Sequence, residues 1–182
     1  MVQKIIDDAR KFVGDWRFTE IERVTIVPGV SCPSGTISKD LKGFPSGAGL
    51  WTQTGENTAE IKLSFTTPPG HLAHEIFHSV LHRSPLQEKA EVWCEGFCEA
   101  FAYLYVGGFE IPRRWELHPE VNTEYQLKYQ LTAERILETA HWDLVQFRLL
   151  FEHLNEFIRK PVVSKGWLNR WAGFDPERGF LD

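Results

Sequence analysis

Cysteines, basic runs and long apolar runs are all scarce in this chain. It has three cysteines among 182 residues, and such a low, odd count is typical of reduced thiols rather than of a disulfide framework. No run of Lys and Arg exceeds two residues and the net charge is −5, so nucleic acid and anionic membranes are not expected partners. No apolar stretch approaches the length of a membrane span.

The first residues also lack the features of a secretion signal. The segment Met1–Asp8 carries acidic residues where a signal peptide needs an uninterrupted apolar stretch. Together with the cysteine count, this predicts a cytoplasmic protein, although export by a route that needs no apolar signal stays open. The contents of 42% hydrophobic and 25% charged residues are ordinary for a globular protein of one domain.

The most informative segment is the pentapeptide His74-Glu75-Ile76-Phe77-His78, an HExxH pattern. On an α-helix, positions i and i+4 lie on one face, so both imidazoles can bind the same metal ion. Glu75 would then lie beside a water in the open position of that metal. Apolar residues recur at helical spacing around the motif, and they predict a helix from about Gly70 to Arg83. The alternative is a surface helix with two solvated histidines.

A catalytic zinc site needs a third protein ligand. A second helix is predicted to follow a capping-box pattern at Ser84–Gln87 and to end near Val106. This helix is rich in glutamate, and Glu91 and Glu95 are the candidates for the third ligand. A tight turn between the two helices would favour Glu91, and Glu95, one turn further on, would then orient a ligating imidazole. The opposite assignment stays open.

Residues 48 to 106 resemble the ImmA/IrrE-type zinc metallopeptidases, which belong to the gluzincin kind. That family carries a strand or hairpin, an AHExxHxxLH run and an E-x-x-(A/C)-N-x-F-A pattern. Ala73–His82 matches the first run in full, and the second pattern fits in frames that begin at Glu91 or at Glu95. The Glu95 frame matches Phe-Ala literally, and in both frames a glutamate replaces the asparagine. The resemblance implies a His₂Glu zinc site and selective cleavage of a regulatory protein.

The remaining pattern predicts an α+β fold. We expect a small antiparallel sheet packed beside the HExxH helix, and a largely helical C-terminal half. One domain over 1–182 is predicted, with a helix plus sheet in 1–69, the active-site helix pair in 70–106 and a helical subregion in 107–182. Its expected elements are a helix at 3–13, a strand within 16–27, a hairpin at 50–63 and helices near 120–140 and 142–159. The hairpin strand Ala59–Leu63 is expected to form the rim of the substrate cleft.

The predicted function is zinc-dependent hydrolysis of peptide bonds, with Zn²⁺ as cofactor, a protein or peptide as substrate and Glu75 as general base. The alternative is a catalytically silent relative that keeps the fold and binds or regulates a partner. Cys94 and Cys98 could also bind zinc with a histidine, but small buried residues are the favoured interpretation. His82 is expected to be a packing partner rather than a ligand. The sequence predicts neither the oligomeric state nor the residue that stabilises an oxyanion.

Overall fold

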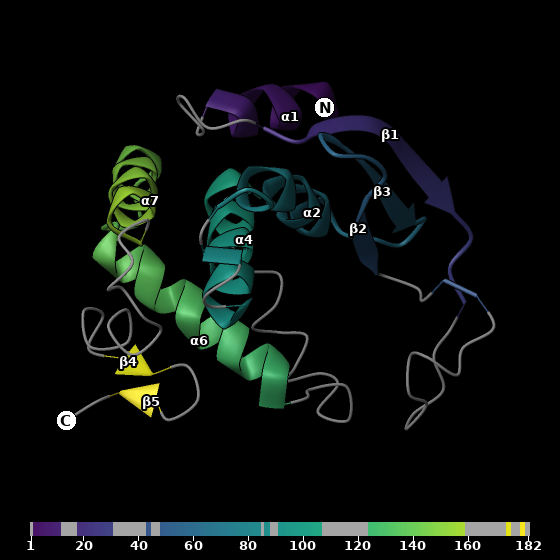
Figure 1. Ribbon diagram of the computed structural model, residues 1–182. Helices are drawn as coiled ribbons and strands as arrows, with labels where there is room; N and C mark the ends of the chain where they lie inside the picture. Colours follow the sequence, from purple (N-terminus) through teal and green to yellow (C-terminus); the bar gives the residue numbers. More distant parts are fainter. Residues whose placement is uncertain are drawn as a thin grey trace.

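The α+β fold is confirmed by a computed structural model of the chain (Figure 1). It describes residues 2–11, 18–30, 43–44, 48–84, 86–87, 91–106, 124–158, 174–175 and 179–180. The helices are α1 (Val2–Lys11), α2 (Pro69–Leu81), α4 (Glu91–Val106), α6 (Glu124–Thr139) and α7 (Leu144–Ile158). The strands are β1 (Glu20–Val27), β2 (Gly49–Gln53), β3 (Thr58–Ser64), β4 (Phe174–Asp175) and β5 (Gly179–Phe180).

The main sheet is mixed rather than wholly antiparallel. Its order is β1-β3-β2, with β2 antiparallel and β1 parallel to the central strand β3. The predicted hairpin between β2 and β3 is therefore confirmed. The chain between β1 and β3 is long enough for a crossover, which parallel pairing requires. Because β3 is central, it cannot be the rim of a cleft as expected; the edge strand beside α2 is β2.

One face of β3 is buried against α2. Ala59, Ile61 and Leu63 alternate along the strand and all belong to the buried core. Phe65 would be the next residue in this alternation, but the strand ends at Ser64 and Phe65 is 73% exposed. The alternation of apolar residues therefore marks the buried face of β3, but this face ends with the strand and does not include Phe65.

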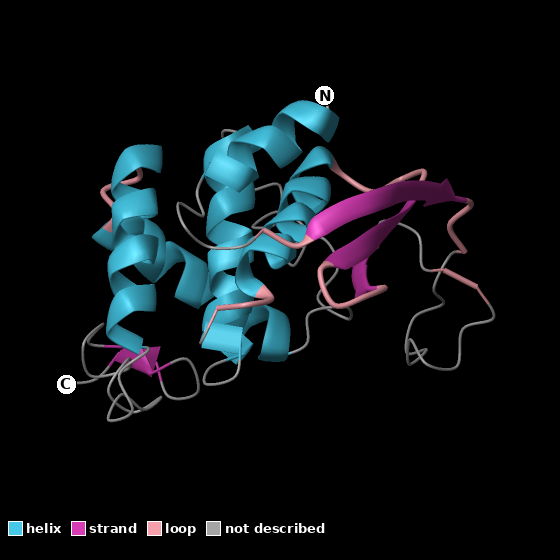
Figure 2. Cartoon of the chain, turned by 45° about the horizontal axis from the view of Figure 1, so that its top comes forward, coloured by secondary structure: helices cyan, strands magenta, loops and turns pink. Residues whose placement is uncertain are grey.

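Helix α2 carries the HExxH motif and lies between the sheet and α4 (Figure 2). Pro69 stands at the start of the helix, where its missing N–H costs nothing. The N-cap residue Pro68 has extended dihedrals and contributes no side-chain cap. Most of the helix is buried, and the buried residues include polar ones such as Glu75 as well as the apolar ones. A helix enclosed on both sides in this way holds its side chains in fixed directions, which a metal site requires.

An aromatic cluster joins α2 to the helical half of the chain. The ring of Phe77 stacks on Phe101 of α4 with centroids 4.6 Å apart. It also meets Phe147 and Phe151 of α7, with centroids 5.9 and 5.5 Å away. These four rings are fully buried. The floor behind the HExxH motif is therefore built partly from helix α7, far away in sequence.

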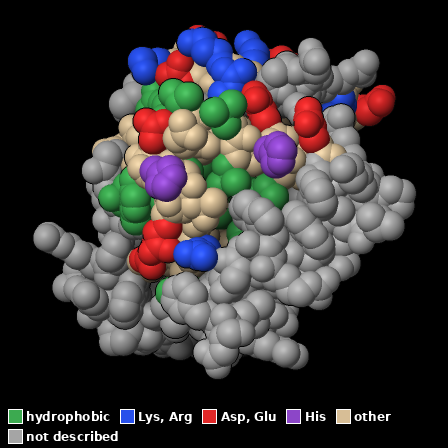
Figure 3. Space-filling model, turned by 90° about the vertical axis from the view of Figure 1, so that its left-hand side faces the viewer, with side chains coloured by type: hydrophobic (Ala, Val, Ile, Leu, Met, Phe, Trp, Pro, Cys, Tyr) green, Lys and Arg blue, Asp and Glu red, His purple; other side chains and the backbone are tan. Residues whose placement is uncertain are grey.

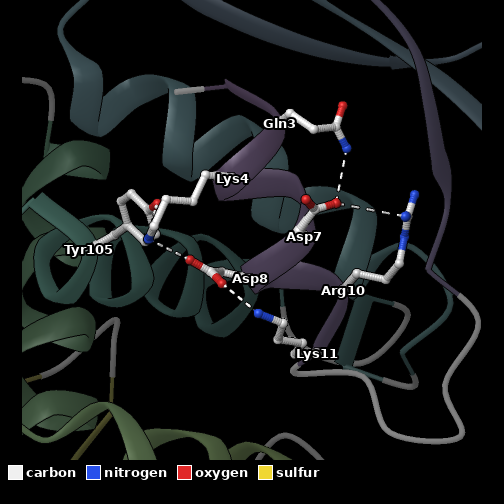
Figure 4. Close-up of polar contacts among 7 residues, drawn as sticks. All are labelled: Gln3, Lys4, Asp7, Asp8, Arg10, Lys11 and Tyr105. Atoms are coloured by element: carbon white, nitrogen blue, oxygen red, sulfur yellow. Dashed lines mark hydrogen bonds and ion pairs between the residues drawn. The ribbon is translucent and has the colours of Figure 1, made fainter.

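Helix α1 is anchored mainly by apolar residues. Ile5, Ile6 and Ala9 are buried in the common core. On its outer face, Lys4 and Lys11 pair with Asp8, and Lys4 also reaches the hydroxyl of Tyr105 (Figure 4). These exposed pairs contribute little to stability, because water and salt screen them.

The described surface mixes charged and apolar groups. Acidic and basic side chains are interspersed along the upper edge of the face in Figure 3, and hydrophobic side chains are visible below them. Among the described residues, no helix has both the length and the apolar character needed to cross a bilayer.

Candidate metal centre

The two histidines of the motif lie side by side on α2, as their spacing predicts. Their Nε2 atoms are 3.2 Å apart, and the rings meet edge to face with centroids 5.0 Å apart. Both rings are largely shielded from solvent, with side-chain exposures of 11% for His74 and 17% for His78. Two ring nitrogens at this distance need a shared proton or a cation, because two facing lone pairs repel each other.

Glu95 of α4 completes a triangle with these nitrogens. Its Oε2 lies 3.2 Å from Nε2 of His74, and its Oε1 lies 3.8 Å from Nε2 of His78. In a tetrahedral zinc site with ligand bonds of about 2.0–2.1 Å, neighbouring ligand atoms are about 3.3 Å apart. The three groups are therefore spaced as ligands of one small cation.

The other candidate, Glu91, is the first residue of α4, and its side chain lies outside the described part of the structure. The sequence argument for Glu91 assumed a tight turn near Ser84. Helix α2 ends at Leu81 and α4 begins only at Glu91, so the connection is longer than that argument assumed. The longer connection explains why Glu95, which lies one helical turn after Glu91 along α4, faces the histidines.

The outer nitrogens of both imidazoles also meet residues of α4. Nδ1 of His74 lies 3.1 Å from Oε1 of Glu99, and Nδ1 of His78 lies 3.6 Å from Sγ of Cys98. The contact with Glu99 is an ion-pair distance without the angle of a directed hydrogen bond. Ligating histidines commonly direct their second nitrogen at a carboxylate, which fixes the ring and increases its basicity. Sequence reasoning placed Glu99 only at the asparagine position of the frame that begins at Glu95, and it did not predict this contact with His74.

The electrostatics of the pair differ between its members. Burial lowers the pKa of His78 to about 4, with a further contribution from neighbouring His74. Burial also lowers the pKa of His74, but Glu99 and Glu95 outweigh it and hold that pKa well above its ordinary value. Burial raises the pKa of Glu95, but contacts with the two histidines reverse this and leave it lowered.

Glu75 points from α2 to the edge strand β2. It is 9% exposed, and its Oε2 accepts a hydrogen bond of 2.7 Å from the backbone N–H of Trp51. Burial raises its pKa, while His74 and the Trp51 N–H partly counteract that effect. A Cβ atom at Gly49 would lie 2.7 Å from Cγ of Glu75, so no other residue type fits there without displacing the carboxylate. Sequence reasoning did not identify Gly49.

Trp51 also forms a wall beside the histidines. Its indole Nε1 donates a hydrogen bond of 2.8 Å to Oγ of Ser79. Its ring lies 5.0 Å from that of His82 and 6.3 Å from that of His78, between centroids. His82 therefore packs against Trp51, as expected for a packing partner.

A second combination of side chains also has the spacing of a metal site. His74, His78 and Cys98 each offer one ligand atom, and these atoms lie within 4.8 Å of one another. Cys94 and Cys98 are both buried, as expected for small residues of the core, and within the described residues neither forms a disulfide. Cys98 has the additional property that it contacts a motif histidine.

Comparisons with protein-family models, curated proteins and solved structures found no match for this chain. The likeness to ImmA/IrrE-type peptidases is therefore a likeness of motifs. The function has to be argued from the geometry of the site.

Proposed function

We propose that this protein is a zinc-dependent peptidase in which His74, His78 and Glu95 hold the metal and Glu75 is the general base. The observation that carries the proposal is the triangle of two imidazole nitrogens and one carboxylate with separations of 3.2, 3.2 and 3.8 Å. A His₂Glu set leaves the fourth position of a tetrahedral ion open, which distinguishes catalytic from structural zinc sites.

The donor set favours zinc over the common alternatives. Two imidazoles and one carboxylate suit zinc, whereas calcium and magnesium prefer sites made entirely of oxygen. The histidine with the lowered pKa, His78, is already in the neutral form that a metal needs. Glu99, beside the outer nitrogen of His74, would stabilise positive charge on that ring.

When bound, zinc would lower the pKa of a water and polarise the carbonyl of a substrate. Glu75 would accept the proton of the attacking water and then pass it to the leaving amine. Its raised pKa suits this role, because a general base works best when its pKa is near the working pH. The N–H of Trp51 and the absence of a side chain at Gly49 hold this carboxylate in one place.

The competing function is a binding or regulatory protein that keeps the metal and does not turn over a substrate. The buried position of Glu75 supports the enzyme, because a metal that only stabilises the fold needs no such carboxylate. The experiment compares wild-type protein with a Glu75→Gln variant for bound zinc and for cleavage of casein and a peptide library. We expect stoichiometric zinc in both proteins and cleavage by the wild type alone. Zinc without cleavage in the wild type would favour the binding protein.

A further inference from the structure

The imidazole of His78 faces different ligand chemistry on its two sides. Its Nε2 atom faces Nε2 of His74 and the carboxylate of Glu95, at 3.2 and 3.8 Å. Its Nδ1 atom faces the thiol of Cys98, at 3.6 Å. The proposed zinc site uses the first side. The second side is not used by the proposed mechanism.

The spacing on the second side also fits a metal ion. With a metal–nitrogen bond of about 2.0–2.1 Å and a metal–sulfur bond of about 2.3 Å, tetrahedral geometry places nitrogen and sulfur about 3.6 Å apart. The Sγ of Cys98 and Nδ1 of His78 have that separation. One ligand atom from each of His74, His78 and Cys98 lies within 4.8 Å of the other two, so the three side chains are grouped closely enough to offer ligands to one cation.

We propose that His74, His78 and Cys98 form a second ligand set that takes a thiophilic cation such as Cd²⁺ or Cu⁺. Thiolate and imidazole together select soft cations, whereas the carboxylate of Glu95 suits a harder ion. Coordination breaks the S–H bond of Cys98, forms a sulfur–metal bond and releases one proton to solvent. No oxidant or reductant takes part.

The two ligand sets use different nitrogens of His78, Nε2 for zinc and Nδ1 for the second cation, but both include His74. A cation held by Cys98 therefore competes with zinc for the imidazole of His74. The inference does not depend on peptidase activity, since it concerns only which side chains bind which cation.

The test uses the full chain in a Cys32→Ser background, so that the α4 thiols are the only ones present. The metal-stripped protein is titrated with Cd²⁺, and the near-ultraviolet charge-transfer absorption of cadmium–thiolate bonds is recorded. A matched control is Cys94→Ser, because Cys94 is equally buried on the same helix one turn earlier. We expect one Cd²⁺ per chain, with absorption that is lost in Cys98→Ser and kept in Cys94→Ser and Glu95→Gln.

The proposal would be overturned if the cadmium–thiolate absorption persisted in Cys98→Ser. It would also be overturned if the parent protein bound cadmium and did not show this absorption. If Cys98→Ser does not fold, cadmium NMR of the parent protein decides the question, because a sulfur ligand moves the resonance strongly downfield. A resonance in the range of nitrogen and oxygen ligands alone overturns the proposal. The Glu95→Gln variant separates the two ideas: it should lose zinc affinity and keep the cadmium–thiolate absorption. Peptidase activity without the cadmium–thiolate absorption would overturn this inference alone. The absorption without peptidase activity would support this inference and count against the proposed function.

Discussion

Nδ1 of His74 lies 3.1 Å from Oε1 of Glu99, and this contact places the imidazole between two carboxylates of α4. On its other side, Nε2 lies 3.2 Å from Oε2 of Glu95. The first carboxylate can orient and polarise the ring, and the second can share a cation with it. Their spacing of four residues on one helix produces both contacts, because residues i and i+4 lie on the same face.

The first prediction concerns Glu99. Glu99→Gln keeps the shape of the side chain and removes its charge, so the imidazole of His74 becomes a weaker ligand. Loss of such a partner lowers metal affinity by about 10–100-fold. Competition with a chromophoric chelator measures the zinc affinity. The control is Glu138→Gln on the exposed face of α6, which should bind zinc like the wild type. Unchanged affinity in Glu99→Gln would show that this contact does not support the metal.

The second prediction separates Glu95 from Glu91. Because Glu95 reaches both Nε2 atoms, Glu95→Ala removes a ligand and should abolish stoichiometric zinc. Glu91→Ala should retain it, because this residue lies one turn earlier, at the start of α4. Elemental analysis of the two purified proteins checks the prediction. Full zinc in both variants would exclude a His₂Glu site, and loss in Glu91→Ala alone would reverse the assignment.

The third prediction concerns Glu75. Glu75→Gln should reduce peptide hydrolysis by about 10²–10⁴-fold, the usual contribution of a general base. Zinc content and fold should be unchanged, since the amide is nearly isosteric and can still accept the hydrogen bond from Trp51. Turnover and bound zinc are measured on the same preparation. Turnover close to that of the wild type would remove Glu75 from the mechanism.

The fourth prediction concerns the glycine that faces this carboxylate. In Gly49→Ala, the added methyl group would lie 2.7 Å from Cγ and 2.8 Å from Oε1 of Glu75, so the side chain must move. A displacement of about 1 Å at a catalytic group can cost about 10²-fold in rate. Thr52→Ala on the same strand is the control, because Thr52 is exposed. Equal kcat in both variants, with zinc retained, would show that the position of Glu75 does not depend on Gly49.

Local pattern predicted much of this fold. The helical spacing of its apolar residues placed α2 within two residues at each end. The turn residues between β2 and β3 gave the hairpin. Such features depend on neighbours in the sequence, so the sequence contains the information needed to predict them.

The parts that were missed depend on packing between distant segments. The parallel pairing of β1 with β3 follows from how the chain crosses over, which no local pattern shows. The roles of Glu99 and Gly49 follow from the angle and register at which α4 and β2 meet α2. The choice between Glu91 and Glu95 depended in the same way on the length of the connection between α2 and α4.

The fifth prediction tests the position of α4, on which the whole site depends. A Cβ atom at Gly96 would lie 2.6 Å from Cγ2 of Thr132 and 3.4 Å from the backbone nitrogen of Ala133. Alanine in place of glycine inside a helix normally stabilises it by about 1 kcal/mol. Here the added methyl group meets the buried surface of α6, and overpacking of this kind costs about 1–3 kcal/mol. We therefore expect Gly96→Ala to lower the melting temperature and, because Glu95 and Glu99 flank this position, to weaken zinc binding.

Gly70→Ala is the matched control for this change, since it is also a glycine in a helix and its nearest neighbour, Cγ2 of Val106, lies at an ordinary 3.8 Å. The control should melt at or slightly above the temperature of the wild type, because it gains helix propensity without a clash. Thermal unfolding and zinc titration of the three proteins give the comparison. If Gly96→Ala is as stable as Gly70→Ala, helices α4 and α6 do not approach as closely as the structure shows. The orientation of α4, and with it the pairing of Glu95 and Glu99 with His74, would then have to be revised.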